Sequence, residues 1–297
     1  MSTANLPRSR SDLGFDIINY SLLTVILVIV SYPLLFAVSA SFSDPMKVLA
    51  GKITLLPQGF RLDAYAKVLE HGQLWRGYLN SIVYTVIGVT VNLIMTTLAA
   101  YPLARRDLKG RGPLMLIFVF TMFFSGGLVP TYLVVKSLAL DNTMWALILP
   151  TAINTYNLIV MRTFFQSTIP GELYEAAHVD GCTNIGMLYR IVLPLSMPIL
   201  AVMFLFYTVE HWNSYFNAMI YLSDRDKFTL QLVLREILIQ SQTAGMMSAD
   251  AGATERLLQS ETIKYAVIIA ASLPVFVLYP FVQRFFVQGV MIGAVKG

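Results

Sequence analysis

Charged residues are scarce in this chain of 297 residues. Asp, Glu, Lys and Arg make up 13% of it, whereas hydrophobic residues make up 56%. Soluble globular domains carry about 25% charged residues, so a soluble protein of this size would need far more polar surface. Several uncharged stretches are longer than about 20 residues, which is enough to cross the hydrocarbon core of a bilayer as a helix. The composition therefore predicts a polytopic helical protein embedded in a lipid bilayer.

Cysteine, histidine and the common catalytic motifs are also rare or missing. Cys182 stands alone, which excludes an internal disulfide, and the three histidines at 71, 178 and 211 are too scattered to predict a metal site. The chain has neither the glycine-rich phosphate loop of ATPases nor the HExxH signature of zinc peptidases. We therefore expect a non-catalytic chain that binds no metal or cofactor, so that any ATP hydrolysis takes place on a partner.

Basic residues exceed acidic ones slightly, and their densest run is ARRDLKGRG, residues 104–112. Nucleic-acid binding would require a clustered basic face with stacking aromatic residues, so no nucleic-acid partner is expected. A short loop rich in Lys and Arg between two apolar runs is typical of the cytoplasmic edge of a membrane protein. This loop places both termini in the cytoplasm, although Lys and Arg counted over the whole chain divide almost evenly between the two sides.

The apolar runs predict an all-α fold, a single transmembrane domain over residues 1–297 with six transmembrane helices. The spans are expected at 17–43, 78–103, 113–136, 145–166, 190–221 and 261–288. A mixed segment at 44–77 contains one short helical pattern, RLDAYAKVLEHG, and the polar stretch 222–260 is expected as a loop on the outer face. A secretory signal is the alternative for the first run, but the run is too long for one, and two acidic residues precede it.

A polar segment, residues 167–189, separates the fourth and fifth predicted spans. Pro170 suits the first turn of a helix, where its missing amide leaves no hydrogen bond unmade. Gly181 is a natural helix end because glycine readily takes the left-handed conformation, and Thr183 can cap a second short helix over 184–189. The pattern predicts two short helices at an angle along the membrane face. On these residues alone, an ordinary interfacial helix remains the alternative.

A second polar feature lies inside the predicted fifth span. One helix face carries, at i, i+3, i+4 and i+7, the polar residues Glu210, Asn213, Ser214 and Asn217, and Tyr207 and Tyr221 extend it. An ionisable residue inside a span faces the bundle interior or a cavity by default, so this face is a candidate substrate path. The alternative is helix–helix packing, since Asn and Ser also bond across membrane helices. Weaker candidates for the path are Asn154, Asn157 and Asn92.

Residues 175–194, EAAHVDGCTNIGMLYRIVLP, resemble the EAA loop of permeases from binding-protein-dependent ABC importers. The family pattern is EAA, three residues, glycine, nine residues and I-x-LP. Every position is filled here, by Glu175, Ala176, Ala177, Gly181, Ile191, Leu193 and Pro194. Two further stretches resemble the sugar-importing branch of the family, HWNSYFNAMIYL (211–222) and the ending QRFFVQGVMIGAVKG (283–297).

This resemblance implies a MalG-like fold and a non-catalytic permease subunit of an ATP-driven importer in the inner (cytoplasmic) membrane of a bacterium. The seven EAA-loop residues are expected to couple transport to ATP hydrolysis, because in this family the loop docks on the ATPase. The expected partners are a second permease subunit, two ATPase subunits that bind ATP and Mg, an external solute-binding protein and a saccharide substrate. KFTLQLVLREILIQ (227–240) resembles the oligo- and polysaccharide-importing subgroup. The whole chain resembles a permease subunit of a bacterial alginate importer, which implies alginate as a candidate substrate.

Two other classes of transporter remain open. A secondary carrier or channel would be expected to show internal inverted repeats and several ion-coupling acids within its spans, whereas this sequence shows no clear repeat and one such acid, Glu210. A permease of the same superfamily for an amino acid or a peptide is the second alternative. The resemblances at 211–222 and at the carboxyl terminus favour a saccharide over that alternative.

Overall fold

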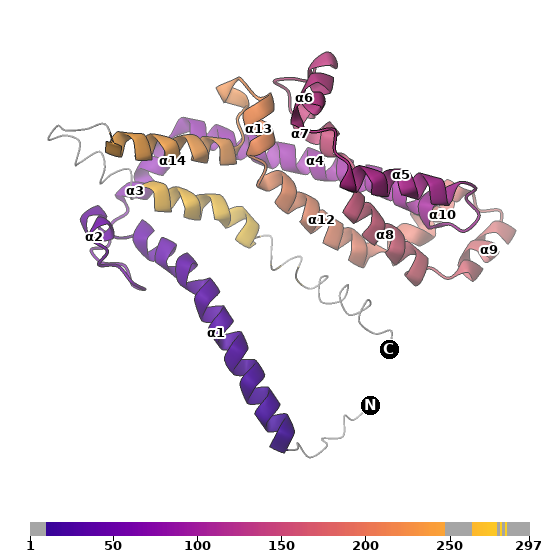
Figure 1. The fold of residues 1–297 in the computed structure, drawn as a ribbon, viewed down its shortest axis with the longest axis horizontal. Helices are drawn as coiled ribbons and strands as arrows, with labels where there is room; N and C mark the ends of the chain where they lie inside the picture. Colours follow the sequence, from indigo (N-terminus) through magenta and orange to yellow (C-terminus); the bar gives the residue numbers. More distant parts are fainter. Residues whose placement is uncertain (1–9, 247–262, 278–279, 281–282, 284–297) are drawn as a thin grey trace. The chain divides into compact units, whose positions relative to one another are not determined.

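The computed structural model describes residues 10–246, 263–277, 280 and 283. These ranges are helical and contain no strand, which confirms the all-α prediction for them (Figure 1). The helices are α1 Arg10–Ser41, α2 Pro45–Leu49, α3 Asp63–Glu70, α4 Gly72–Ala104, α5 Arg111–Phe123, α6 Leu128–Ser137, α7 Trp145–Ile148, η1 Leu149–Thr151, α8 Thr155–Thr168, α9 Gly171–Val179, α10 Asn184–Met187, η2 Leu188–Val192, α11 Leu193–Leu195, α12 Met197–Trp212, α13 Phe216–Tyr221, η3 Arg225–Lys227, α14 Leu230–Met246 and an apolar helix at Ile263–Val277.

Within the described residues, two helices are long and apolar enough to cross a membrane, Leu13–Ser41 and Gly72–Ala104. They correspond to the first two predicted spans. Two bent pairs of helices pass the same test together, which raises the number of candidate spans to as many as four. The arrangement of six spans stays a prediction.

The third predicted span, 113–136, is not one straight helix. It is divided into α5 and α6, which meet at an angle of 114°. The break contains Gly126 and Gly127, and Gly127 has a φ of +88°, a conformation that residues with a Cβ rarely adopt. The prediction of a continuous helix is wrong here because the glycine pair allows the chain to turn sharply.

The fourth predicted span, 145–166, is divided as well. Pro150 lies in the 3-10 turn η1 between α7 and α8, and proline cannot donate the amide that a continuing helix needs. Asn154 then begins α8 as its N-cap, where its side chain accepts a hydrogen bond from the Asn157 amide at 3.3 Å. Both signals are present in the sequence, and the prediction of a single span overlooked them.

The fifth predicted span, 190–221, also departs from one helix. Its entry, Asn184–Leu195, meets α12 at an angle of 83°, and α12 ends at Trp212. The expected outer loop, 222–260, holds helix α14 in its first half, because its buried residues Leu230, Val233 and Leu234 follow helical spacing. Residues 247–260 of that stretch lie outside the described residues.

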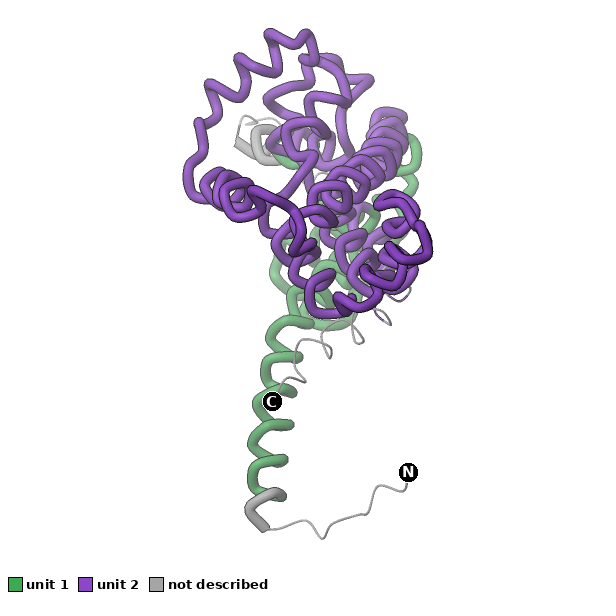
Figure 2. Tube along the Cα trace, turned by 90° about the vertical axis from the view of Figure 1, so that its right-hand side faces the viewer, with its two compact units in different colours: residues 1–70, 237–270 green, residues 71–236, 271–297 purple. Residues whose placement is uncertain are grey.

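The chain forms two compact units, coloured separately in Figure 2: residues 1–70 with 237–270, and residues 71–236 with 271–297. The first unit is built around the end of α1. Its buried cluster consists of Ala40, Val48 and Ile53, with Phe36 and Tyr265 packed against it. The Phe42 ring stacks on Tyr65 with 4.9 Å between centroids, which holds α3 beside the end of α1. The helix α3 is the one expected within residues 61–72.

The second unit is organised around α4, along which α8 and α12 pack. The buried face of α4 is made mainly of small and polar residues at helical spacing, namely Gly77, Ser81, Thr85, Gly88, Asn92, Thr96 and Ala100. Small residues let helices approach closely in a membrane, where lipid tails provide no hydrophobic drive for association. The closest approach is at Gly88, where a Cβ would lie 2.5 Å from His211 Nε2 on α12.

We expect Gly88→Ala to destabilise the second unit. The added methyl would overlap the imidazole of His211, which cannot swing aside without losing its contact with Asn92, and overpacking of this kind costs about 1–3 kcal/mol. Gly112→Ala on α5 is the matched control, because nothing lies within 4 Å of its Cβ position. Thermal unfolding of the protein in detergent should give a clearly lower midpoint for Gly88→Ala. Equal midpoints for the two variants would contradict the close packing of α4 and α12.

Candidate functional site

The first candidate site is the EAA segment, residues 167–194. It folds as two short helices, α9 and α10, as the sequence predicts. Gly181 lies between them with a φ of +71°, and Thr183 Oγ1 caps α10 by accepting a hydrogen bond from the Gly186 amide at 3.1 Å. One detail differs from the expectation, because Pro170 is the N-cap of α9 and the helix starts one residue later.

The second helix of the segment does not end at 189 as predicted. It continues through a π-helical turn, η2, into α11, where Pro194 occupies the second position. Proline is tolerated there because the first turn of a helix leaves its amides unpaired, and the wide π-turn precedes it. The chain therefore leaves the EAA segment as a helix and bends only afterwards, at Ser196.

The seven motif residues fall into two groups in the structure. Ala177 is buried, and Ile191 and Leu193 are half-buried and pack against the core of the second unit. The exposed members are Glu175, Ala176, Gly181 and Pro194. The motif thus combines residues that anchor the segment with residues that remain available to a partner.

Four large apolar side chains of the EAA segment are exposed as well. Val179 is 87% exposed, Ile185 71%, Tyr189 63% and Leu173 38%. Apolar side chains gathered on one short exposed segment are typical of a surface that binds another protein or a membrane. Together with the Glu175 carboxylate they give this segment a mixed apolar and acidic face.

Arg105, which follows α4 as its C-cap, contacts both helices of the EAA segment. Its guanidinium lies 5.5 Å from the centre of the Tyr174 ring on α9, and its Nη1 donates a hydrogen bond to Asn184 Oδ1 on α10. Its Nε and Nη2 donate to the two carboxylate oxygens of Asp107 at 2.8 and 2.5 Å. These hydrogen bonds hold the pKa of Asp107 below its usual value. The sequence analysis treated Arg105 only as one charge in a basic loop and missed these contacts.

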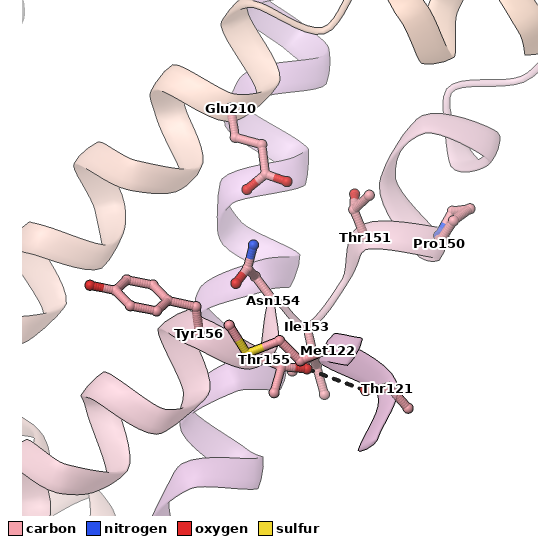
Figure 3. Close-up of a pocket in the computed structure, with 9 residues that line it drawn as sticks. All are labelled: Thr121, Met122, Pro150, Thr151, Ile153, Asn154, Thr155, Tyr156 and Glu210. Carbon is pink, nitrogen blue, oxygen red and sulfur yellow. Dashed lines mark hydrogen bonds between the residues drawn. The ribbon is translucent and has the colours of Figure 1, made fainter. Parts of the chain in front are cut away.

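The second candidate site is a cavity of about 400 Å³ in the second unit (Figure 3). Its lining consists of Thr121, Met122, Pro150, Thr151, Ile153, Asn154, Thr155, Tyr156 and Glu210. The Glu210 side chain reaches from α12 toward Asn154, at the start of α8. Hydroxyls, one amide and one carboxylate meet in this space, and none of these nine described residues is basic.

The predicted polar stripe on the fifth span does not exist as one helix face. α12 ends at Trp212 and α13 begins at Phe216, so Asn213 and Ser214 lie in the break while Asn217 lies on α13. The Asn213 side chain donates a hydrogen bond to the Val209 carbonyl at 2.9 Å, and such local bonding by asparagine competes with helix continuation. Of the stripe residues, Glu210 lines the cavity.

The other path candidates are mostly packing residues. Tyr207 is fully buried, its hydroxyl lies 2.6 Å from Thr96 Oγ1, and the Asn154 amide donates to it at 3.4 Å. Asn92 is also fully buried and donates from Nδ2 to the Thr151 carbonyl at 2.6 Å, while its Oδ1 lies 2.7 Å from His211 Nε2. These contacts are the ones expected of the packing alternative.

The remaining candidates for the substrate path are Asn154, Asn157 and Tyr221. Asn157 is buried within α8, and Tyr221 is buried with its ring stacked on Tyr132 at 6.1 Å between centroids. Asn154 is the one candidate of the fourth span that lines the cavity. The polar contacts of Asn92 and Tyr207 hold its wall, because they end on Thr151 and Asn154.

The chain matches the model of the family described as binding-protein-dependent transport system inner membrane component over residues 3–292. It is 45% identical over 284 residues to the polygalacturonan/rhamnogalacturonan transport system permease protein YtcP of Bacillus subtilis (strain 168), covering 95% of this chain and 98% of that protein. It is 29% identical over 281 residues to the arabinooligosaccharides transport system permease protein AraQ of Halalkalibacterium halodurans, covering 92% and 93%.

Solved structures give the same picture of the fold. A chain of a bacterial ABC transporter involved in the import of the acidic polysaccharide alginate is similar with a TM-score of 0.84 and 33% identity, covering 95% of this chain and 100% of that one. A chain of a bacterial alginate ABC transporter in complex with alginate pentasaccharide-bound periplasmic protein has a TM-score of 0.58 and 18% identity, covering 94% and 96%. At that identity the second likeness shows the fold alone.

Tyr207→Phe is expected to destabilise the second unit and to loosen the cavity wall. The substitution leaves the fully buried Thr96 hydroxyl without its side-chain partner, and an unsatisfied buried polar group costs about 1–3 kcal/mol. Tyr156→Phe is the matched control, since the same hydroxyl is removed from a side chain that is 56% exposed. Denaturation monitored by tryptophan fluorescence should separate the two variants. A Tyr207→Phe protein as stable as Tyr156→Phe would show that the Tyr207 hydroxyl is not a packing contact.

Proposed function

Because the chain belongs to the family of binding-protein-dependent transport system inner membrane components, we propose that it is the permease subunit of an ATP-driven importer for an oligo- or polysaccharide. The names of its relatives support a saccharide, since they refer to polygalacturonan, rhamnogalacturonan and arabinooligosaccharides. Polygalacturonan, rhamnogalacturonan and alginate are acidic polysaccharides. An acidic polysaccharide is therefore the narrower candidate, and alginate is one substrate of this kind.

The observation that carries this proposal is the form of the EAA segment. Two short helices stand exposed beside the ends of α4 and α8, with Ala177, Ile191 and Leu193 packed inward and Glu175 outward. The exposed Val179 and Ile185 would be covered by an ATPase subunit docking on this face. The Glu175 carboxylate would then meet a basic group of the ATPase, so that closure of the ATPase dimer pushes on the segment.

The proposed assembly follows from this role. The chain would pair with a second permease subunit, two ATPase subunits that bind ATP and Mg, and an external solute-binding protein. In the inner membrane we place both termini and the EAA segment on the cytoplasmic side, with six spans in all. In this assembly the chain would conduct the substrate, and ATP would be hydrolysed on the two ATPase subunits.

We place the saccharide path at the cavity that holds Glu210. Sugar hydroxyls require hydrogen-bond donors and acceptors, and the lining supplies threonine hydroxyls, the Asn154 amide and the Glu210 carboxylate. Tyr156, which also lines the cavity, adds an aromatic ring of the kind on which sugar rings stack. The path candidates are therefore narrowed to Glu210 and Asn154, joined by four cavity residues that sequence reasoning did not select, Thr121, Thr151, Thr155 and Tyr156.

Glu175→Lys is expected to uncouple ATP hydrolysis from transport while the membrane subunits still assemble. The substitution would change an attraction into a like-charge contact at the docking face, which costs several kcal/mol in well-packed interfaces. ATPase activity of the complex in proteoliposomes, with and without loaded binding protein, measures the coupling. Glu70→Lys, an equally exposed charge reversal at the end of α3, is the control. Stimulation equal to wild type in Glu175→Lys would remove Glu175 from the interface.

Glu210→Ala is expected to slow saccharide uptake and to leave basal ATP hydrolysis intact. Hydrogen bonds to a charged group contribute about 1.5–3 kcal/mol, so uptake should fall by at least about tenfold. Asn213→Ala is the control, because Asn213 lies three residues further along and its side chain bonds to the Val209 carbonyl instead of lining the cavity. Uptake of a labelled arabinooligosaccharide, a neutral sugar whose hydroxyls can donate to the Glu210 carboxylate, into proteoliposomes distinguishes the two variants. Equal uptake by Glu210→Ala and wild type would exclude Glu210 from the path.

A further inference from the structure

The end of α4 is fixed to its surroundings by several side chains that donate to its last carbonyls. Arg162 Nε donates to the Leu103 carbonyl at 3.0 Å and Gln166 Nε2 to the Ala104 carbonyl at 3.3 Å, both from α8. Arg111 Nη1 donates to the carbonyl of Arg105 at 3.3 Å. The carbonyls at a helix end have no partner within the helix, so these bonds satisfy groups that would otherwise be unpaired. Arg105 therefore projects from a fixed backbone.

The Arg105 guanidinium joins this fixed backbone to the EAA segment. It contacts Asn184 on α10 and the Tyr174 ring on α9, while the Tyr101 hydroxyl donates to the Asn184 carbonyl at 3.1 Å. The planar guanidinium of Arg105 thus contacts both short helices of the EAA segment. Within the described residues, these three contacts join α4 and its C-cap to the two short helices, and all of them involve Arg105 or Tyr101.

An ordinary surface ion pair does not account for this arrangement. Exposed pairs contribute about 0–1 kcal/mol because water screens them and both side chains lose freedom. The Asp107 side chain is 65% exposed, but that of Arg105 is 19% exposed, so its guanidinium is largely shielded from water. Asp107 engages one edge of the guanidinium through two oxygens, which orients Nη1 toward Asn184.

We propose that Arg105 is a positioning residue that transmits movement of the EAA segment to α4 and, through α4, to the cavity wall. The inference rests on the proposed function. The planar fork of arginine meets Asp107, Asn184 and the Tyr174 ring at the same time, which the single ammonium of a lysine cannot do. Further along α4, Asn92 donates to the Thr151 carbonyl, and Thr96 contacts the Tyr207 hydroxyl, to which the Asn154 amide donates. A displacement of α4 would therefore displace Thr151 and Asn154, which both line the cavity.

The test measures whether the state of the ATPase partners still reaches the cavity. A single cysteine replaces Tyr156, which is exposed and lines the cavity, in a Cys182→Ser background. The assembled complex in proteoliposomes is labelled with a maleimide before and after vanadate trapping of the ATPase subunits. Coupling between sites typically changes an equilibrium by about 5–150-fold, so trapping should change the labelling rate by at least about fivefold.

Arg105→Ala is expected to reduce this change to well below about fivefold, the lower end of typical coupling between sites, with the complex still assembled. Arg106→Ala, the same substitution at the exposed neighbouring arginine, should keep the full change. Arg105→Lys should give an intermediate change, because the charge remains and the fork is lost. Asn184→Ala removes the hydrogen bond between Arg105 and Asn184 from the Asn184 side. This variant replaces Arg105→Ala in the test if the Arg105→Ala complex does not assemble.

The outcomes separate the two hypotheses. An unchanged response in Arg105→Ala, or in Asn184→Ala where Arg105→Ala does not assemble, overturns the role of Arg105 and leaves the proposed function standing. A wild-type complex whose cavity labelling does not respond to vanadate trapping would overturn the ATP-driven function itself. A response lost equally in Arg105→Ala and Arg106→Ala would show a general effect of positive charge in this loop, and would also overturn the specific role of Arg105.

Discussion

The close approach of α12 to α4 is the contact on which the second unit depends. The His211 ring of α12 packs directly against Gly88 of α4, in the space that a larger side chain would fill. The same ring is hydrogen-bonded to Asn92 of α4. In lipid, helices gain little from hiding apolar surface, so close packing and hydrogen bonds between helices must provide the stability. The same Asn92 holds the Thr151 carbonyl, which ties the broken fourth span to this contact. Cavity and helix packing are therefore parts of one network.

The EAA segment shows how one motif serves two purposes. Its buried members resemble core residues anywhere, since Ala177 and Leu193 fill space beside α4 and α8. Its exposed part keeps apolar and acidic side chains that the described residues of the chain leave uncovered. A segment that is firmly seated on one side and open on the other can receive a force from a partner without unfolding. This division gives a physical reason for a polar interruption between two apolar runs.

Sequence reasoning reached the helical class, the two long helices and the capped turn of the EAA segment, because each depends on local signals such as Gly181 and Thr183. It failed at Gly126-Gly127 and at Pro150, where the length of the apolar run was given more weight than the glycine pair and the proline that interrupt it. It could not foresee that Tyr207 and Asn92 are buried, since the direction of a polar side chain depends on its neighbours across the bundle. The spacing of small residues along α4, read from Gly77 to Ala100, was a usable signal for the buried face.

The small residues of α4 also have a consequence for conformational entropy. A buried lysine or methionine gives up about 1.5–2 kcal/mol of rotamer freedom, whereas glycine and alanine give up essentially none. A face made of Gly77, Gly88, Ala100 and short hydroxyl side chains can therefore be brought against two other helices with almost no loss of side-chain freedom. The same face can part and close again at equally low entropic cost. A transporter whose helices must separate and return in every cycle is served by such a surface better than by interlocking long side chains.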